Sequence, residues 1–519
     1  MRLLSIKLLV KMPARPHPNP AATLSYSWSL SSPNDNAPNF SVDLYETSFD
    51  MDGPPFPLTQ PISTSSSNDG HQPELVEAYV ESLQEITPDN LQSPSLPLYQ
   101  YPSATPVKRR VASYRHILPI GSPNVPAREM GDYLAIELDR IPPIPIVNLP
   151  SIIFPDSLLP FPVNEALVTS LGNKIWSTRR KVLRPPSYLT EVAVQQWLND
   201  ITGAISDIVK VPPKNTWSAK YANTVLDHDE LKHKPDIILI RNGLLTSINW
   251  RNIHVVTEVT SSDKMHATMK RTINNKTYLM FCTQHSRRFV PFLAVCADFI
   301  HFIVSDRQGQ AIADIPYRQS GVYHALDIIR IVVALMFGSD EIIGYDSTIE
   351  TLPDGEITKI STDGKDYRVS STVHTVRGIV GRSTRVWSAY DMSLDGGKKS
   401  VIIKDGWIQE GCANAEKEHL EALHRRKVRG VLVLIWGGTV QAHLPLGDSN
   451  SELHDDNTLW IHNMFSDRRA YCIHRHLVLS PVGENLSTFS SLGELIAALR
   501  DIAVGTSTTS FIYHTYTLQ

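Results

Sequence analysis

Cysteine is scarce in this chain of 519 residues, which has only four, and none of them stands in a C-x-x-C pair. They are Cys282, Cys296, Cys412 and Cys472. So scattered a set excludes a disulfide-stapled scaffold and a cysteine-rich zinc site, and it is typical of a reducing compartment. We therefore expect an intracellular protein, either cytoplasmic or nuclear.

Long apolar runs and a dominant charge are lacking too. No apolar run reaches the roughly 18 residues that a membrane span requires, so we expect no membrane partner. The opening MRLLSIKLLVKM is short and broken by lysines, which argues against a secretory signal. The formal net charge is −4, so nucleic acid is not an expected partner. What remains is a protein partner or substrate of unknown identity.

The first 125 residues or so are rich in proline, serine and asparagine, as in STSSSND and SSPNDNAPNF. Such sequence buries too little apolar surface to offset the entropy of ordering, and we expect a disordered leader. Residues 73–86 favour one short helix within it. The basic segment 107–116 is interpreted as a solvated linker, with a localisation or docking signal as the alternative.

Residues 126–349 alternate helical and strand patterns. REMGDYLAIELDRI and YLTEVAVQQWLNDITGAISDIV have helical spacing, and the second has a broad apolar face. KPDIILIRNG, NIHVVTEVT and FVPFLAVCADFIHFIVSDRQG predict strands, with a helix at MHATMKRTINNKTYLMFCTQH between them. A buried helix is predicted at residues 326–337, a GYD motif follows it, and we interpret residues 126–349 as a mixed α/β layer.

Two carboxylates in this region are candidate metal ligands. Asp236 precedes one predicted strand and Glu258 lies in the next, so that both could hold Mg²⁺ by hard oxygen ligation. Restriction-type nucleases of the PD-(D/E)XK fold resemble this arrangement but have a lysine two residues after the glutamate, where this chain has Thr260. Lys264 is a possible substitute, and Glu191 on the preceding helix a further carboxylate. The alternative is a domain that keeps the nuclease-like fold but has no nuclease activity.

Residues 350–375 contain two Asp-Gly turns and are predicted to be a hairpin that links two domains. From residue 376 the pattern predicts three strands, TVRGIV, RVWSAYDM and VIIKD, with a hairpin signal at DGGKK, and then a short helix in AEKEHLEAL. This region, 376–519, is predicted to form a separate domain.

The order of these parts is the order that a kinase small lobe needs: a glycine turn over phosphates, a strand lysine, and a helix glutamate that holds the lysine. Here they would be Gly381, Lys404 and Glu416, with Val386 ending the glycine pattern. Only one of the three glycines is present, because Ile379 and Thr384 occupy the other two positions. A plain β-meander with Lys404 as a solvated edge lysine is the alternative.

The rest of the chain predicts a central strand at RGVLVLIWG, a strand at YCIHRHLVLSPVG and a helix at LSTFSSLGELIAALRDIAV. A kinase also needs a catalytic-loop Asp with an Asn five residues later, and then a metal-binding Asp. Three segments resemble such a loop and lack its pattern: His474-Arg475-His476, His454-Asp455-Asp456 and the segment around Asp501. We interpret all three as structural, and the kinase-like domain as truncated and inactive.

Several segments, among them GRSTRVW, VIIKDGW, KPDIILI, SDRQG and GYDSTI, resemble the fungal-type protein kinase family in matching order from about Lys234 to about Asp501. The resemblance implies ATP and Mg²⁺ as cofactors, although binding here is doubtful without the full glycine loop. The predicted fold class is α+β: a disordered leader, a nuclease-like layer, and an incomplete kinase small lobe with a fragment of the large lobe. Three functions stay open, namely an inactive kinase relative, a binding or scaffold protein, and a Mg²⁺-dependent nuclease.

Overall fold

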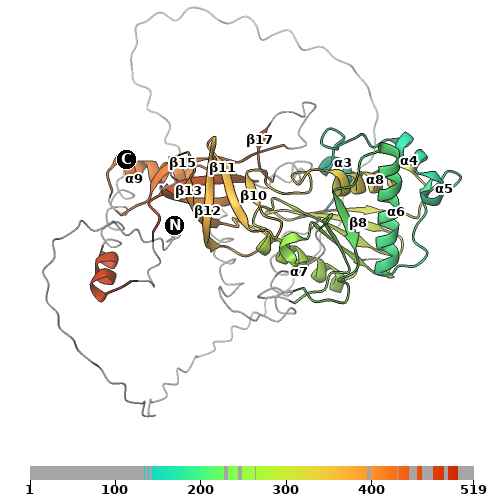
Figure 1. The fold of residues 1–519 in the computed structure, drawn as a ribbon, viewed down its shortest axis with the longest axis horizontal. Coiled ribbons are helices and arrows are strands. Elements are labelled where there is room, and N and C mark those ends of the chain that lie inside the picture. Colours follow the sequence, from blue (N-terminus) through green and yellow to red (C-terminus); the bar gives the residue numbers. More distant parts are fainter. Residues whose placement is uncertain are drawn as a thin grey trace, which may run out of the picture. The chain divides into compact units, whose positions relative to one another are not determined.

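Two seven-stranded sheets follow one another along the chain, each with its own helices (Figure 1). The computed structural model describes residues 134, 138, 143–226, 232–243, 248–263, 265–393, 399–428, 430–443, 453–458, 471–483 and 489–500. All of them belong to one compact unit. The leader, residues 107–116, Lys264, Asp501 and residues 395–398 of the DGGKK turn, for which we made predictions, lie outside the described residues.

The first sheet has the strand order β1-β9-β8-β7-β6-β5-β4. Strands β4, β5 and β6 form an antiparallel meander, β6 runs parallel to β7, and β7, β8 and β9 form a second meander. The parallel step needs a crossover, and helix α7 provides it. The strands are β1 (Ile144–Pro145), β4 (Asn215–Ser218), β5 (Ile237–Arg241), β6 (Val255–Val259), β7 (Val290–Val295), β8 (Ile300–Ser305) and β9 (Gln310–Ile315).

Helices cover both faces of this sheet. Along β8, Phe302 and Val304 pack with helices α6 and α8, whereas Ile303 packs with α7 on the other face. Successive side chains of a strand point to opposite faces, so a strand buried on both faces reads as a continuous apolar run. These helices are α6 (Glu191–Val209), α7 (Ala267–Thr283) and α8 (Val322–Phe337). Shorter elements are α3 (Leu149–Ile153), α4 (Glu165–Ser170), α5 (Gly172–Ile175), β2 (Trp176–Ser177), β3 (Val182–Leu183) and η1 (Trp250–Asn252).

The second sheet is antiparallel throughout and has the order β10-β11-β12-β13-β14-β18-β15. Its strands are β10 (Ile349–Thr351), β11 (Ile357–Thr362), β12 (Lys365–Thr375), β13 (Arg385–Asp391), β14 (Ser400–Gln409), β15 (Val433–Thr439) and β18 (Cys472–Ser480). The connection from β14 to β15 carries η2 (Glu410–Cys412) and helix α9 (Ala415–Arg425). Two short strands, β16 (Gln441–Ala442) and β17 (His454–Asp455), pair with each other, and residues 492–500 are helical.

The predicted helices at α6, α7, α8 and α9 are confirmed, as are the strands at β5 to β8, β13, β14 and β18. Three expectations were wrong. TVRGIV is a loop after its first residue, because the strand that precedes the glycine turn is β12. Segment 350–375 forms the predicted hairpin, but its strands belong to the second sheet. Strand β15 lies at the edge of that sheet, because β18 inserts between β14 and β15.

None of the described helices combines the length and apolar character that a membrane crossing requires.

Candidate functional site

The predicted ion pair between Lys404 and Glu416 is present. The Lys404 Nζ atom lies 2.5 Å from Glu416 Oε1 and 2.6 Å from Oε2. Lys404 is on β14, between β13 and β18, and its side chain is 13% exposed, so the plain edge-lysine alternative is wrong. Glu416 lies in the first turn of α9, and the side chain of Arg475 on β18 donates to Asn414 Oδ1 at 2.8 Å just ahead of that turn. The strand and the helix start are therefore held together at the pair.

An apolar surface lies on the same face of the sheet. Val386 on β13 pairs in register with Lys404. It forms a buried cluster with Ile402 of β14 and with Leu477 and Leu479 of β18. Leu420 of α9 packs against this cluster, so the spacing of leucines in α9 serves the contact that the sequence predicted.

The glycine turn between β12 and β13 contacts the first layer. Ile379 is fully buried among the side chains on the α7 face of the first sheet. The backbone N–H of Gly381, which has φ 106°, donates to Arg307 O at 2.8 Å. The Arg307 side chain donates to Gly378 O at 3.0 Å, and its guanidinium lies 3.8 Å from the ring centre of Phe281. The turn is thus bound to residues of its own chain. An apolar Ile379 within a glycine turn was the one sequence signal for this docking.

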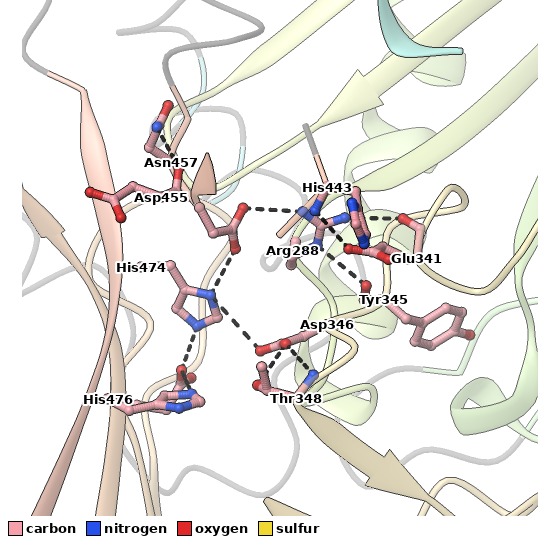
Figure 2. A network of polar contacts seen from close by, with 12 residues as sticks. Arg288, Glu341, Tyr345, Asp346, Thr348, His443, Asp455, Asn457, His474 and His476 are labelled. Atoms are coloured by element: carbon pink, nitrogen blue, oxygen red, sulfur yellow. Dashed lines mark hydrogen bonds and ion pairs between the residues drawn. The ribbon is translucent and has the colours of Figure 1, made fainter. Parts of the chain in front are cut away.

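The His474-Arg475-His476 segment lies within strand β18 and not in a loop, in agreement with the prediction that it is structural (Figure 2). His474 Nε2 is 2.5 Å from Asp405 Oδ1, and His474 Nδ1 is 2.8 Å from Asp456 Oδ2. Burial by itself lowers the pKa of an imidazole, but these two carboxylates outweigh it and raise the pKa of His474 to about 10. In return, although burial opposes it, the imidazolium holds the pKa of Asp405 well below its usual range.

Residues from both sheets take part in this buried network, which we call the central network (Figure 2). Arg288, just ahead of β7, donates to Asp456 Oδ1 at 3.1 Å. Arg385 of β13 lies 3.4 Å from Asp405 Oδ2 and also donates to the backbone carbonyl of His285. Sequence analysis missed these contacts, since the partners lie up to 168 residues apart in the chain.

A third carboxylate of the central network comes from the GYD motif. Asp346 Oδ1 accepts hydrogen bonds from the backbone N–H and the hydroxyl of Thr348, at 2.8 and 2.7 Å. Its Oδ2 has no hydrogen-bond partner and lies 3.9 Å from His474 Nδ1. The network therefore contains three buried carboxylates, two arginines and one imidazolium, which balance in charge: Asp346, Asp405, Asp456, Arg288, Arg385 and His474.

The carboxylates predicted as nuclease-like ligands meet at neighbouring strand ends. Asp236 precedes β5 and Glu258 lies in β6, which pairs with β5. Asp236 Oδ2 accepts the backbone N–H of Val259 at 2.9 Å. Burial raises the pKa of Glu258, the positive charge of Lys276 lowers it, and the negative charge of Asp236 raises it. Together these effects raise the pKa to about 7.

The positive charge at this site comes from a residue that sequence analysis did not consider. Lys276, in the middle of α7 and 1% exposed, forms an ion pair and hydrogen bond with Glu258 Oε1. Glu191 is the first residue of α6, and among the described residues no hydrogen bond or ion pair joins it to Asp236 or Glu258. The sequence signal that could have indicated this pair is a lysine on the buried face of the helix that packs against the strand of Glu258.

A strand lysine held by a helix glutamate, in an antiparallel sheet with one connecting helix, is the arrangement expected of a protein-kinase small lobe. Residues 234–508, more than half of the chain, match the family described as fungal protein kinase, and the chain belongs to that family. The match begins directly ahead of β5, so it includes most of the first sheet as well as the second. No curated protein and no solved structure matches the chain.

Proposed function

We propose that this chain is a kinase-like protein that retains the lysine–glutamate pair of a small lobe without transferring phosphate, and that it acts by binding a protein partner. One observation carries the proposal: the Lys404–Glu416 pair is formed while the glycine turn is docked on the first layer. A kinase uses both parts together, the turn to cover the phosphates of ATP and the lysine to contact them.

The backbone amides of a glycine loop bind phosphate oxygens only when they are free to donate. In this chain the N–H of Gly381 is already hydrogen-bonded to Arg307 O. Releasing it would expose Ile379, which is fully buried. Nucleotide binding would therefore compete with the packing of the chain's own core. ATP and Mg²⁺, the cofactors of the family, are expected to bind weakly.

Calorimetric titration with Mg-ATP tests this function. We expect a dissociation constant above about 1 mM for the unmodified chain, and no transfer of radiolabelled phosphate to protein. Lys404→Met is the site variant, and Lys399→Met, at an exposed lysine just ahead of β14, is its matched control. Micromolar binding that Lys404→Met abolishes and Lys399→Met retains would contradict the proposal, and so would any phosphate transfer.

A second candidate function is Mg²⁺-dependent phosphodiester cleavage, which the contact between Lys276 and Glu258 favours. A nuclease of this type needs two carboxylates for the metal ion and a lysine that steadies the attacking water. Asp236 and Glu258 would be the metal ligands, and Lys276 would supply the charge that Thr260 lacks. The element order α6-β4-β5-β6-α7-β7 brings all three residues to one end of β5 and β6.

Plasmid nicking in the presence of Mg²⁺ tests the second candidate. It predicts that supercoiled plasmid is nicked, that chelation stops the reaction, and that Asp236→Ala abolishes it. Asp263→Ala, at an exposed aspartate four residues after β6, is the matched control and should leave nicking unchanged. Intact plasmid with the unmodified chain, or equal nicking by both variants, would remove this function.

A further inference from the structure

The carboxylate of Asp346 and the imidazoles of His474 and His476 converge within the central network. Each of the three residues offers one ligand atom, and these atoms lie within 4.8 Å of one another. All three side chains are buried, with exposures of 3%, 2% and 1%. They come from two distant parts of the chain, the GYD motif and the middle of β18, so folding alone brings them together.

Two of these groups have ligand atoms without a well-formed hydrogen bond. Asp346 Oδ2 has no hydrogen-bond partner, whereas Oδ1 of the same carboxylate is fixed by Thr348. His476 Nε2 has no hydrogen bond either, although it lies 3.3 Å from Asp405 Oδ1. A buried polar atom without a partner costs free energy, and a bound ion is one of the ordinary explanations for it. In Figure 2 the carboxylate of Asp346 points toward the ring of His474, and the ring of His476 lies beside it.

We propose that Asp346, His474 and His476 form a binding site for one divalent metal ion of the zinc type. Two imidazoles and one carboxylate are a ligand set typical of Zn²⁺, whereas Mg²⁺ and Ca²⁺ prefer oxygen ligands alone. Tetrahedral bonds of about 2.0–2.1 Å place neighbouring ligand atoms about 3.3 Å apart. Asp346 Oδ2 and His474 Nδ1 are 3.9 Å apart, and all three ligand atoms lie within 4.8 Å of one another, so the ligand atoms must approach one another by up to about 1.5 Å around the ion.

The surrounding residues suit this role. His474 donates its Nε2–H to Asp405, and that bond orients the ring so that Nδ1 faces Asp346. A carboxylate that holds the second nitrogen of a ligating histidine is the usual outer support of a zinc site. Trp407 stacks on the His474 ring at 4.5 Å between centroids and fixes its plane. Asp405 and Trp407 are thus positioning residues.

Metal binding at His474 Nδ1 displaces one proton, the one now shared with Asp456 Oδ2. Asp456 keeps its charge compensation, because Arg288 donates to its other oxygen at 3.1 Å. The exchange replaces one proton by one dication, so the net charge of the six groups of the central network rises from zero to +1. The ion would bridge β18 to the segment that ends the first layer, and this role is independent of any nucleotide at Lys404.

Zinc titration of the full chain, after removal of metal by a chelator, tests the site. We expect one tightly bound equivalent of Zn²⁺ by calorimetry and by elemental analysis after gel filtration. Asp346→Asn, which keeps an oxygen for the Thr348 contacts, and His476→Gln should each weaken the binding at least about 100-fold. His374→Ala, at an exposed histidine on β12, is the matched control and should bind Zn²⁺ as the unmodified chain does.

A spectroscopic measurement on the unmodified chain keeps the proposal falsifiable even if the variants fail to fold. Co²⁺ in place of Zn²⁺ should give the intense visible absorption of a tetrahedral site with nitrogen and oxygen ligands. A spectrum typical of octahedral Co²⁺, or the lack of a tight equivalent of Zn²⁺, would overturn the proposal. Undiminished binding by folded Asp346→Asn and His476→Gln would do the same.

Discussion

Asp405→Ala is expected to lower the free energy of unfolding by about 3–5 kcal/mol, the cost of removing one partner from a buried ion pair. Asp405 is fully buried and faces both Arg385 and His474, at 3.4 and 2.5 Å. Without it the guanidinium and the imidazolium lose their shared counter-charge in the interior of the protein. Chemical denaturation of the full chain, followed by circular dichroism, measures the change.

The control for this variant is Asp366→Ala. Asp366 also takes part in an ion pair, with Lys359 at 3.5 Å, but its side chain is 49% exposed and that of Lys359 is 33% exposed. Surface pairs contribute little because solvent screens them, so this variant should unfold at nearly the same denaturant concentration as the unmodified chain. Equal losses for the two aspartates would mean that the central network is not the reason for the effect.

Lys276→Met is expected to cost about 3 kcal/mol, and Glu258→Gln in the same chain should recover much of the loss. The single change leaves the carboxylate of Glu258 buried beside Asp236 without its cation, whereas the double change removes both charges. The glutamine still offers an oxygen to the backbone N–H of Asp236, which donates to Glu258. A double-mutant cycle on denaturation midpoints isolates the coupling between the two positions.

Lys174→Met serves as the control on the same layer. Lys174 pairs with Asp200 at 3.2 Å, but its side chain is 79% exposed, so the expected change is within about 1 kcal/mol. If the losses from Lys276→Met and Glu258→Gln simply add in the double variant, the two residues do not depend on each other, and the buried pair is not a unit.

Short sequence patterns correctly predicted those helices, strands and contacts whose partner residues lie nearby in the chain. The apolar positions of α6 recur at helical spacing, and Thr190 caps its start by accepting the backbone N–H of Ala193. The pair of Lys404 and Glu416 was predictable for the same reason, since only the second half of β14 and the short η2 connection separate them. In both cases short connections leave few alternative arrangements.

Contacts over long distances in the chain were not predictable in this way. Nothing near Asp405 in sequence indicates His474 as its partner, because β18 reaches β14 only after β15 and a long excursion. The same insertion moves β15 to the sheet edge, although its apolar run is typical of a central strand. Lys276 was not predicted because it lies 18 residues after Glu258 on a different element, α7, and not near the strand end where the nuclease pattern has its lysine.

The docking of Ile379 has a consequence for how such chains can be divided or recombined. Separating the two sheets near residue 350 would remove Ile379 from the first layer and leave a cavity of one isoleucine side chain, at a cost of about 2–5 kcal/mol. The Arg307 guanidinium would also lose the carbonyls of Gly378 and Ile379. A chimaera that takes its second sheet from a relative therefore needs an apolar residue of similar size at position 379. The glycine turn is thus part of the contact between the two sheets, although Ile379 lies thirty residues after Ile349, where the second sheet begins.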